Sequence, residues 1–465
     1  MLIRGREVRF TNLVSRLDLN KKRVLVVGLG RSGVASALFL KSRGARVTVS
    51  DAKSEDQLPD EIPALLDQGI AVETGGHGER TFQNQDLIVV SPGVPVDSQA
   101  LNQARALGAP VIGEIELACE FLPGRIVAIT GSNGKTTTTT LIGEILAKSG
   151  VKTLVGGNIG TPAISLVPEA TAETAVVLEV SSFQLETIRS FHPAITVVLN
   201  VTPDHLDRHR TFAAYVNAKA RIFENQTSDD FAVLNADDPT CVEMAARTRA
   251  QVFWFSRKNL VEKGAFVKDA QLTFRRDNSD FDIMPVAAVL LKGAHNVENV
   301  LASICAAALM GCDPVRIRDA VRQFKAVEHR LEFVATAQGV DYYNDSKATN
   351  VDATIKALES FPANVHLILG GKDKGSDYTL LNELLRERVK CVYTIGAAAE
   401  KIESQIRGPK KVVSSGTIES AVRQASDSAV PGDIVLLAPA CASFDQFQNY
   451  EHRGRVFKEL VRALK

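Results

Sequence analysis

Short apolar runs alternate with helical patterns along most of the chain. Near the N-terminus, the β-branched run 23–27 is followed by glycines, an apolar-periodic stretch over 34–40 and a second run over 46–49. Strand, turn, helix and strand in this order predict a parallel βαβ unit. The alternation continues through the run 87–90 and stops near Gly113, where we place the first domain boundary.

Two further series of strands follow, again with helical patterns between them. The second series comprises runs at 126–130, 175–180 and 194–199 with a long apolar helix over 299–310, and the third comprises runs at 340–343, 365–369, 391–395 and 434–437. Strands alternating with helices predict an α/β fold. We expect three domains, over residues 1–113, 114–326 and 327–465, each a mostly parallel sheet with flanking helices.

Length and composition agree with this picture. The 465 residues fit three domains of about 150 residues each. Lys plus Arg and Asp plus Glu both number 54, so the molecule has no large field to attract nucleic acid or an anionic membrane. Six cysteines without a CxxC pair indicate reduced core thiols. No run approaches about 18 apolar residues and residues 1–6 have no signal-peptide core, so we expect a cytoplasmic protein.

A glycine-rich loop follows the strand at 126–130 and precedes a helical pattern over 136–148. The loop consists of Gly131, Ser132, Asn133, Gly134, Lys135, Thr136 and Thr137. Its backbone N–H groups and the helix dipole would converge on an anion, while Lys135 reaches the β- and γ-phosphates and Thr136 offers a hydroxyl to Mg²⁺. The usual pattern has glycine where Ile129 stands, so this loop is a shortened variant. The alternative is a Gly/Asn turn with a solvated lysine.

A second glycine pattern, Gly28-Leu29-Gly30-Arg31-Ser32-Gly33, follows the first strand, and Asp51 ends the next strand at the spacing of a ribose-binding acid. This pattern predicts a dinucleotide site and an alternative function as a nicotinamide-dependent dehydrogenase. We favour that alternative less, because a phosphate loop lies downstream and no catalytic pair for hydride transfer is evident. The same physics fits any diphosphate at that helix N-terminus, including a nucleotide sugar.

Polar residues in the second series are candidates for catalysis. Glu179 ends an apolar strand at the edge where parallel sheets bind ligands, so it is a candidate Mg²⁺ ligand, with a salt-bridged glutamate as the alternative. His205, in the cluster 204–209, is a candidate for a metal or phosphoryl contact, although the cluster alone favours a polar surface. Lys219 lies in a helical stretch, where the residues alone favour a solvated lysine.

Other polar groups are typical of ligand contacts. Asn296 and Asn299 share one helix face and can satisfy the donor and acceptor edges of a base. Arg330 can clamp phosphate oxygens in a fork. Polar loops at 344–350, 370–374 and 440–445 each follow a strand of the third series, so we expect them to face a common cleft.

Together these motifs resemble those of the Mur ligase family, across all three domains. Segments 130–137, 156–160, 204–209 and 329–330 are similar to elements shared by the family, and segments 181–186, 344–350 and 439–447 resemble the members that add D-glutamate. The resemblance implies Rossmann-like first and third domains around a central ATPase domain. It implies an ATP-dependent amide ligase that adds D-glutamate to UDP-N-acetylmuramoyl-L-alanine through an acyl phosphate. Its place would be cytoplasmic peptidoglycan precursor synthesis, hence cell-wall biogenesis, cell shape and cell division.

The resemblance also assigns residues to each substrate. For the UDP-sugar these are Arg31 and Ser32 near the diphosphate, Asp51 and Lys53 near uracil, Ser91 and Gly93 in the same site, and Asn158 and His205 at the alanyl end. For ATP they are the phosphate loop with Asn296, Asn299, Arg330, Asp345 and Lys347, and for D-glutamate Thr349, Lys374, Ser443 and Tyr450, where the family usually has Phe. We expect a monomer that binds these small molecules and neither nucleic acid nor a membrane.

Two Mg²⁺ sites and a carbamylated Lys219 are implied as well, which reverses the solvated interpretation of this lysine. Metal ligands would be Thr136, Glu179, His205 and Lys219, and the catalytic set Lys135, Glu179, His205 and Lys219. Because water would hydrolyse an acyl phosphate, we expect the third domain to close over the cleft before chemistry. A third class of function, an inactive nucleotide-binding regulator, is disfavoured because the catalytic set is intact.

Overall fold

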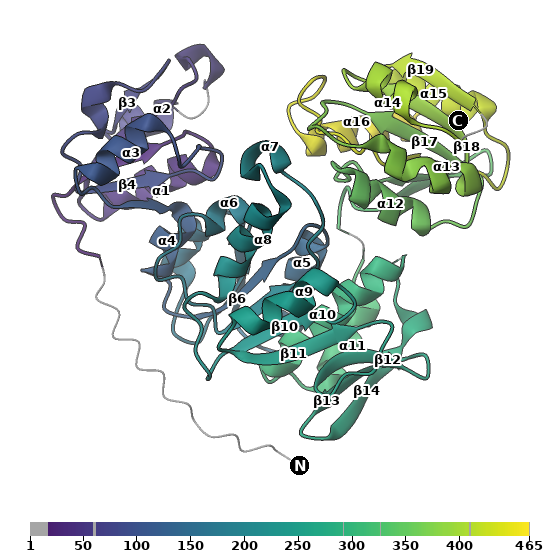
Figure 1. Ribbon diagram of the computed structural model, residues 1–465, viewed down its shortest axis with the longest axis horizontal. Coiled ribbons are helices and arrows are strands. Elements are labelled where there is room, and N and C mark those ends of the chain that lie inside the picture. Colours follow the sequence, from purple (N-terminus) through teal and green to yellow (C-terminus); the bar gives the residue numbers. More distant parts are fainter. Residues whose placement is uncertain (1–16, 59–61, 292, 326, 409–410, 465) are drawn as a thin grey trace. The chain divides into compact units, whose positions relative to one another are not determined.

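The computed structural model describes residues 17–58, 62–291, 293–325, 327–408 and 411–464. Within these residues the chain forms three sheets flanked by helices (Figure 1), which confirms the predicted fold class. The chain divides into two compact units: one comprises Met1–Arg125, Gly156–Thr174 and Phe183–His192, and the other comprises Ile126–Val155, Ala175–Ser182 and Pro193–Lys465. Domain boundaries at residues 113 and 326 stay a prediction, and the expectation about residues 1–6 lies outside the described residues.

A parallel sheet of five described strands is the centre of the first unit. Its elements are β1 (Arg23–Val27), α1 (Arg31–Ser42), β2 (Arg46–Ser50), α2 (Ile62–Asp67), β3 (Ala71–Glu73), β4 (Leu87–Val90), α3 (Gln99–Ala106), β5 (Val111–Gly113) and α4 (Glu114–Cys119). The strand order is β3-β2-β1-β4-β5. Strands β1 and β4 are almost wholly buried, which explains their continuous apolar sequences. Strands β2 and β3 are added on one side of β1, and β4 and β5 on the other. Sheets of this kind bind ligands at the point where the strand order reverses, which here lies between β1 and β4.

The second unit contains a larger sheet, with nine strands among the described residues. Its strands are β6 (Arg125–Thr130), β7 (Thr153–Gly157), β8 (Ala175–Glu179), β9 (Ile195–Val198), β10 (Phe231–Asn235), β11 (Gln251–Ser256), β12 (Gly264–Lys268), β13 (Gln271–Arg276) and β14 (Ser279–Pro285). Their order is β14-β13-β12-β11-β10-β9-β6-β8-β7. Pairing is parallel from β6 through β9, β10 and β11 to β12, and antiparallel from β12 to β14. Strand β6, which leads into the phosphate loop, therefore lies inside the sheet.

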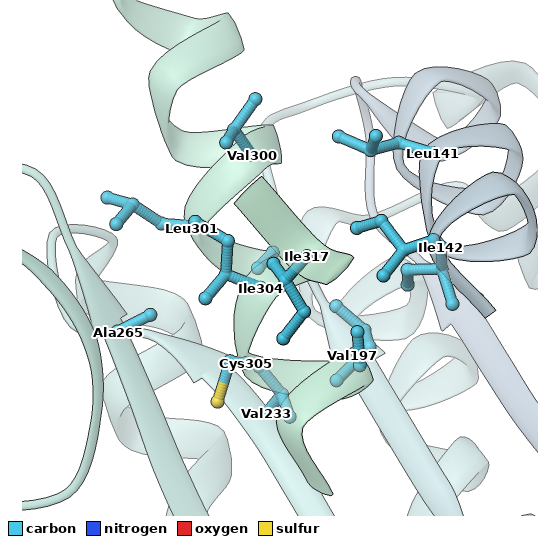
Figure 2. Close-up of a cluster of buried hydrophobic side chains, with 14 of the residues drawn as sticks. Leu141, Ile142, Val197, Val233, Ala265, Val300, Leu301, Ile304, Cys305 and Ile317 are labelled. Carbon is cyan, nitrogen blue, oxygen red and sulfur yellow. The ribbon is translucent and has the colours of Figure 1, made fainter. Parts of the chain in front are cut away.

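Helices of this region bury the sheet. They are α5 (Lys135–Lys148), α6 (Ser182–Leu185), α7 (Leu206–His209), α8 (Phe212–Ala220), α9 (Pro239–Met244), α10 (Ala294–Leu309) and α11 (Pro314–Gln323). Figure 2 shows Leu301, Ile304 and Cys305 of α10 among side chains of α5, α11 and the strands. Most of α10 is buried, as its apolar sequence predicts. None of the described helices is long and apolar enough to cross a membrane.

The third sheet also belongs to the second unit. Its elements are β15 (Glu332–Ala337), β16 (Val340–Asn344), α12 (Val351–Glu359), β17 (Val365–Gly370), α13 (Asn382–Arg388), β18 (Val389–Ile395), α14 (Ala399–Gln405), β19 (Lys411–Gly416), α15 (Ile418–Ser428), β20 (Ile434–Leu437) and α16 (Tyr450–Arg462). The order is β15-β16-β20-β17-β18-β19, with β15 antiparallel to β16. The loops after β16, β17 and β20 therefore lie side by side. The amide of Ala440 donates to Ala348 O at 2.9 Å, and Lys372 pairs with Ala442, so these loops are in contact. That they face a common cleft stays a prediction.

Candidate functional site

The phosphate loop connects β6 to α5, and its backbone is built for close approach. Gly134 has a φ of 85°, in the left-handed region, directly before the first residue of α5. A Cβ atom at Gly134 would lie 2.2 Å from Asn299 Oδ1, so the loop packs tightly against α10. The strand–loop–helix context predicted from the sequence is confirmed. The alternative of a Gly/Asn turn with a solvated lysine is wrong, because Lys135 Nζ bonds two carbonyl groups of the loop and Ser132, Thr136 and Thr137 are buried.

Lys135 folds back over its own loop. Its Nζ donates to Gly131 O and to Ser132 O, each at 2.9 Å. Burial lowers the pKa of Lys135, and the charge of Glu179 opposes that shift. The ammonium group is thus held against a cradle of backbone groups, which is the position required to neutralise a phosphate.

A cluster of three side chains lies at the start of α5, with Thr136 and Glu179 buried and Lys347 half-buried. Thr136 Oγ1 donates to Glu179 Oε2 at 2.7 Å, and Lys347 Nζ donates to Thr136 Oγ1 at 2.5 Å. Glu179 is only 2% exposed. Burial lowers the pKa of Lys347 to about 8, although Glu179 acts to raise it. The structure therefore brings a hydroxyl, a carboxylate and an ammonium together beside the phosphate loop.

Lys219, on α8, is buried beneath the same loop. Its Nζ donates to Gly131 O at 2.7 Å and lies 4.6 Å from the centre of the Tyr215 ring. Only 1% of the residue is exposed, so the solvated interpretation from the residues alone is wrong. Burial, reinforced by the charge of Lys135, holds the pKa of Lys219 well below its usual value. A lysine in this setting readily loses its proton.

Two histidines at the ends of α7 have different surroundings: His205 precedes the helix and His209 is its last residue. His205 has a φ of 54°, and burial lowers its pKa to about 4, so its ring is neutral at pH 7. Asn350 donates to the neighbouring Asp204 at 2.9 Å. His209 instead points into the protein, with Nε2 3.0 Å from Ser182 Oγ. The cluster is therefore partly buried and not simply a polar surface.

A cleft of about 220 Å³ in the second unit extends from the phosphate loop. Its lining includes the predicted residues Asn133, Gly134, Thr137, Asn296, Asn299, Arg330, Asp345 and Lys347. The side-chain amide of Asn299 donates from Nδ2 to Asn296 Oδ1 at 3.1 Å. Arg330 Nε is buried and has no hydrogen-bond partner among the described residues, so the cleft contains a donor ready for a ligand. Burial raises the pKa of Asp345 to about 6, against the charge of Arg330.

Several residues lining the cleft escaped the sequence-based interpretation. Asp237 and Lys258 follow β10 and β11, so the rule that ligands bind at strand ends could have found them. Asp352 on α12 accepts from Asn133 Nδ2 at 2.5 Å and from Thr202 Oγ1 at 3.2 Å. No local signal indicates Asp352, because its partners are distant in sequence.

The glycine loop of the first unit is organised by a carboxylate. Asp51 Oδ2 accepts from the amide of Leu29 at 2.6 Å, and Asp51 Oδ1 accepts from the amide of Lys53 at 2.8 Å. Ser91 Oγ donates to Gly28 O at 2.8 Å. Asp51 thus holds the loop in place. Because both of its carboxylate oxygens already accept backbone amides, Asp51 is less suited to binding a ribose, as a dehydrogenase would require. Arg31 and Ser32 begin α1, and Gly93 lies in the turn after β4.

Asn158, in the loop after β7, is exposed. The segment that follows this loop is anchored by Glu114, a residue that the sequence did not indicate. Glu114 Oε1 accepts from the amide of Ile164 at 2.8 Å, and the residue is 1% exposed. Burial raises the pKa of Glu114 to about 7. A buried carboxyl group thus fixes the chain downstream of Asn158.

Residues assigned to D-glutamate lie on the three adjacent loops of the third sheet and at the start of α16. Ser443 is buried, Thr349 and Lys374 are half-buried, and the ring of Tyr450 lies 5.0 Å from Lys347 Nζ. Arg453 supports these loops and was not predicted. Its fully buried guanidinium donates to Ser346 O at 2.8 Å and to Cys441 O at 3.1 Å, joining the loops after β16 and β20.

Comparison with known proteins matches three parts of the chain to domains of one family. Residues 22–113 match the MurD-like N-terminal domain of Mur ligases, 129–307 the Mur ligase middle domain, and 329–441 the glutamate ligase domain of Mur ligases. A protein of Koribacter versatilis is 66% identical over 96% of this chain and 99% of its own length, and one of Acidobacterium capsulatum is 59% identical over 96% and 97%. Both are named UDP-N-acetylmuramoylalanine–D-glutamate ligase.

The chain belongs to the Mur ligase family.

Solved structures agree on the fold of this Mur ligase. UDP-N-acetylmuramate-alanine ligase from Thermotoga maritima superposes with a TM-score of 0.60 at 19% identity, over 96% of this chain and all of that one. A pseudomurein peptide ligase type C from Methanothermus fervidus gives 0.61 at 21% identity, with the same coverage. At these identities the likeness concerns the fold alone, and residue roles in this Mur ligase rest on its own geometry.

Proposed function

We propose that this Mur ligase uses ATP to join D-glutamate to UDP-N-acetylmuramoyl-L-alanine, with release of ADP and phosphate. The observation that carries the proposal is the near-full-length identity with two relatives that bear this name. The geometry supports it, because a phosphate loop, a buried carboxylate and several cations converge in one unit beside a cleft. The pathway is the synthesis of peptidoglycan precursors.

ATP would lie in the cleft with its phosphates on the loop 131–137. Backbone N–H groups at the start of α5 and the ammonium of Lys135 would receive the β- and γ-phosphates. Lys347 and Arg330 add positive charge, and Arg330 Nε would gain the acceptor it needs. Asn296 and Asn299 would exchange their mutual hydrogen bond for contacts with the nucleotide.

The residues around Thr136 fit Mg²⁺. Thr136 and Glu179 present two oxygen donors 2.7 Å apart, buried beside the phosphate loop. In the described residues no group of three or more His, Cys, Asp or Glu could hold a metal ion unaided. Mg²⁺ commonly takes one or two protein ligands and completes its shell with water and substrate phosphates. When bound, it would offset the negative charge where a carboxylate meets the triphosphate; a second ion near His205 is part of the proposal.

Carbamylation of Lys219 is also part of the proposal, and the surroundings of this lysine support it. Carbon dioxide reacts with a neutral amine, and burial favours the neutral form of Lys219. The modification would replace a cation beneath the loop by an anion able to help position the second Mg²⁺. Labelling with ¹³C-bicarbonate should give a carbamate signal in the wild type and none in Lys219→Arg, whose guanidinium stays protonated. A wild type without the signal but with full activity would contradict carbamylation.

Within this site the chain orients and neutralises the reactants. The alanyl carboxylate attacks the γ-phosphorus, which yields an acyl phosphate and ADP. The free amine of D-glutamate then attacks the acyl carbon, and the tetrahedral intermediate expels phosphate to leave the amide. Lys135 and Lys347 reduce the repulsion between carboxylate and triphosphate, and positioning provides most of the remaining acceleration. Lys374 would hold a carboxylate of D-glutamate, with Ser443 and Thr349 nearby.

The deciding experiment measures ADP and phosphate release from the purified protein with a panel of D- and L-amino acids and the UDP-substrate. Release is expected only when UDP-N-acetylmuramoyl-L-alanine and D-glutamate are both present. NADH oxidation without ATP dependence would point to a dehydrogenase, and ATP binding without turnover would point to a regulator. Either result would overturn the proposal.

A further inference from the structure

The loop after β17 carries two opposite charges in succession, Asp373 and Lys374. The carboxylate of Asp373 is heavily engaged: Oδ1 accepts from Tyr378 OH at 2.8 Å and from the amide of Ser376 at 3.1 Å, and Oδ2 accepts from Lys401 Nζ at 2.7 Å. Burial acts to raise the pKa of Asp373, but these hydrogen bonds hold it below its usual value. The carboxylate of Asp373 is therefore ionised, and both of its oxygens already accept hydrogen bonds.

The partners of Asp373 tie the loop to its surroundings. Lys401 lies on α14, and its Nζ is 5.5 Å from the centre of the Tyr378 ring. The Tyr378 side chain is buried, with its hydroxyl 2.9 Å from Cys441 Sγ, two residues before Ser443. Asp373 is thus the point at which the loop after β17, helix α14 and the loop after β20 are joined.

Lys374, the next residue, takes no part in this network. It is half-buried, and among the described residues its ammonium forms no hydrogen bond or ion pair. The charge of Asp373 is thus satisfied by Lys401 and Tyr378, whereas that of Lys374 is left for a ligand.

We propose that Lys401 is a positioning residue that keeps Asp373 away from Lys374, so that the Lys374 ammonium stays available for a carboxylate of the incoming amino acid. The inference rests on the proposed function and deepens its substrate recognition. Without Lys401, Asp373 would lose its charged partner, and its two chain neighbours are both lysines, the exposed Lys372 and the half-buried Lys374. An Asp373–Lys374 pair would compete with the substrate carboxylate and weaken its binding.

This competition makes a specific prediction for double variants. Lys401→Met should raise the KM for D-glutamate about fivefold, the range of a partly exposed ion pair, with kcat and the KM for ATP unchanged. Asp373→Asn, which removes the competitor, should have a smaller effect. The double variant should behave like Asp373→Asn alone, because without the competing carboxylate the loss of Lys401 has little consequence. Lys401→Arg, which retains the charge, should keep the KM of the wild type.

Controls separate this role from a general loss of structure. The Lys401 side chain is 36% exposed, so the variants are expected to fold and to melt near the wild type. Glu400→Gln, an exposed neighbour on α14, should leave every kinetic constant unchanged. An unchanged KM for D-glutamate in Lys401→Met, or losses that add up in the double variant, would overturn the inference alone. A wild type inactive with D-glutamate would overturn the proposed function and this inference together.

Discussion

The two glycine-rich loops of this chain share a backbone plan and differ in charge. Each follows an inner strand of a mostly parallel sheet and leads into a helix, α1 in the first unit and α5 in the second. In the first loop the acid Asp51 is occupied by the amides of Leu29 and Lys53. In the second, Lys135 lies over the loop, and Glu179 and Lys347 meet at Thr136.

This difference separates binding from chemistry. Backbone N–H groups at a helix N-terminus are enough to hold a diphosphate, which is all that the first loop would have to do. Transfer of a phosphoryl group also requires preorganised charge in a site shielded from water. Of these two loops, only the one between β6 and α5 has both a buried carboxylate, Glu179, and a half-buried ammonium, Lys347, at its first helical turn.

The largest effect is expected from removing the cation of the second loop. Lys135→Ala should lower ATP-dependent turnover by about 10³-fold, because phosphate neutralisation is lost where charge develops. Arg31→Ala, the corresponding change beside the first loop, should mainly raise the KM for the UDP-substrate. Steady-state ADP release checks both variants. A Lys135→Ala variant that kept a tenth of the wild-type turnover would contradict the claim that the second loop serves catalysis and the first only binding.

A smaller loss is expected from the buried carboxylate. Glu179→Gln keeps the shape of the side chain and removes its charge, so turnover should fall by about 10²-fold and require more Mg²⁺. Glu144→Gln, on the exposed surface of α5, provides the matched control and should behave as wild type. Titration of activity with Mg²⁺ measures the effect. Identical Mg²⁺ dependence in Glu179→Gln and the wild type would exclude Glu179 from the metal site.

Glycine substitutions test the backbone of the first loop. A Cβ atom at Gly33 would lie 1.8 Å from Gly28 O, whereas one at Gly30 would meet nothing within 4 Å. Gly33→Ala should therefore destabilise the first unit by about 2 kcal/mol and abolish binding of the UDP-substrate, without affecting ATP binding. Gly30→Ala should leave stability unchanged. Calorimetry and melting curves distinguish the two, and an equally stable Gly33→Ala would contradict the described loop.

The last prediction concerns stability and pH, through the buried Glu114. Its pKa rises from 4.5 to about 7 on folding because the carboxyl is buried, so between these values the folded state binds the extra proton. The stability from this proton is present below pH 4.5 and is lost as pH rises to about 7, by roughly 1.4 kcal/mol per pH unit. Relative to Glu114→Gln, the wild type should thus lose stability from pH 5 to pH 8. Thermal unfolding at each pH measures this difference. A difference in stability between the two proteins that did not change with pH would refute the prediction.

Local patterns were sufficient for much of the fold and for the phosphate loop. Strands such as β4 and β20 have the predicted bounds, because a continuous apolar run between turn residues is a signal carried by adjacent residues. Lys135 was proposed from the glycine-rich loop motif and Glu179 from its place at the end of a parallel strand, and both signals are local.

Residues whose roles depend on distant contacts were not accessible from such patterns. The burial of Lys219 depends on the loop that lies over α8, and a single helical lysine looks the same whether buried or exposed. Asp352 and Arg453 act through partners far away in the chain, and Glu114 through the amide of Ile164. Only the resemblance to a family, and not the spacing of residues, indicated a special role for Lys219.

The strand order of the large sheet has a consequence for synthesis on the ribosome. Strand β6 pairs with β9, so Val127 meets Ile195 only after the chain between them has emerged, and α10 arrives later still. Until then the edge of β6 that faces β9 has no partner strand, and the sheet lacks the cover of α10. Such non-local pairing slows folding and exposes nascent chains to aggregation. This Mur ligase should therefore depend on chaperones more than a helical protein of equal length.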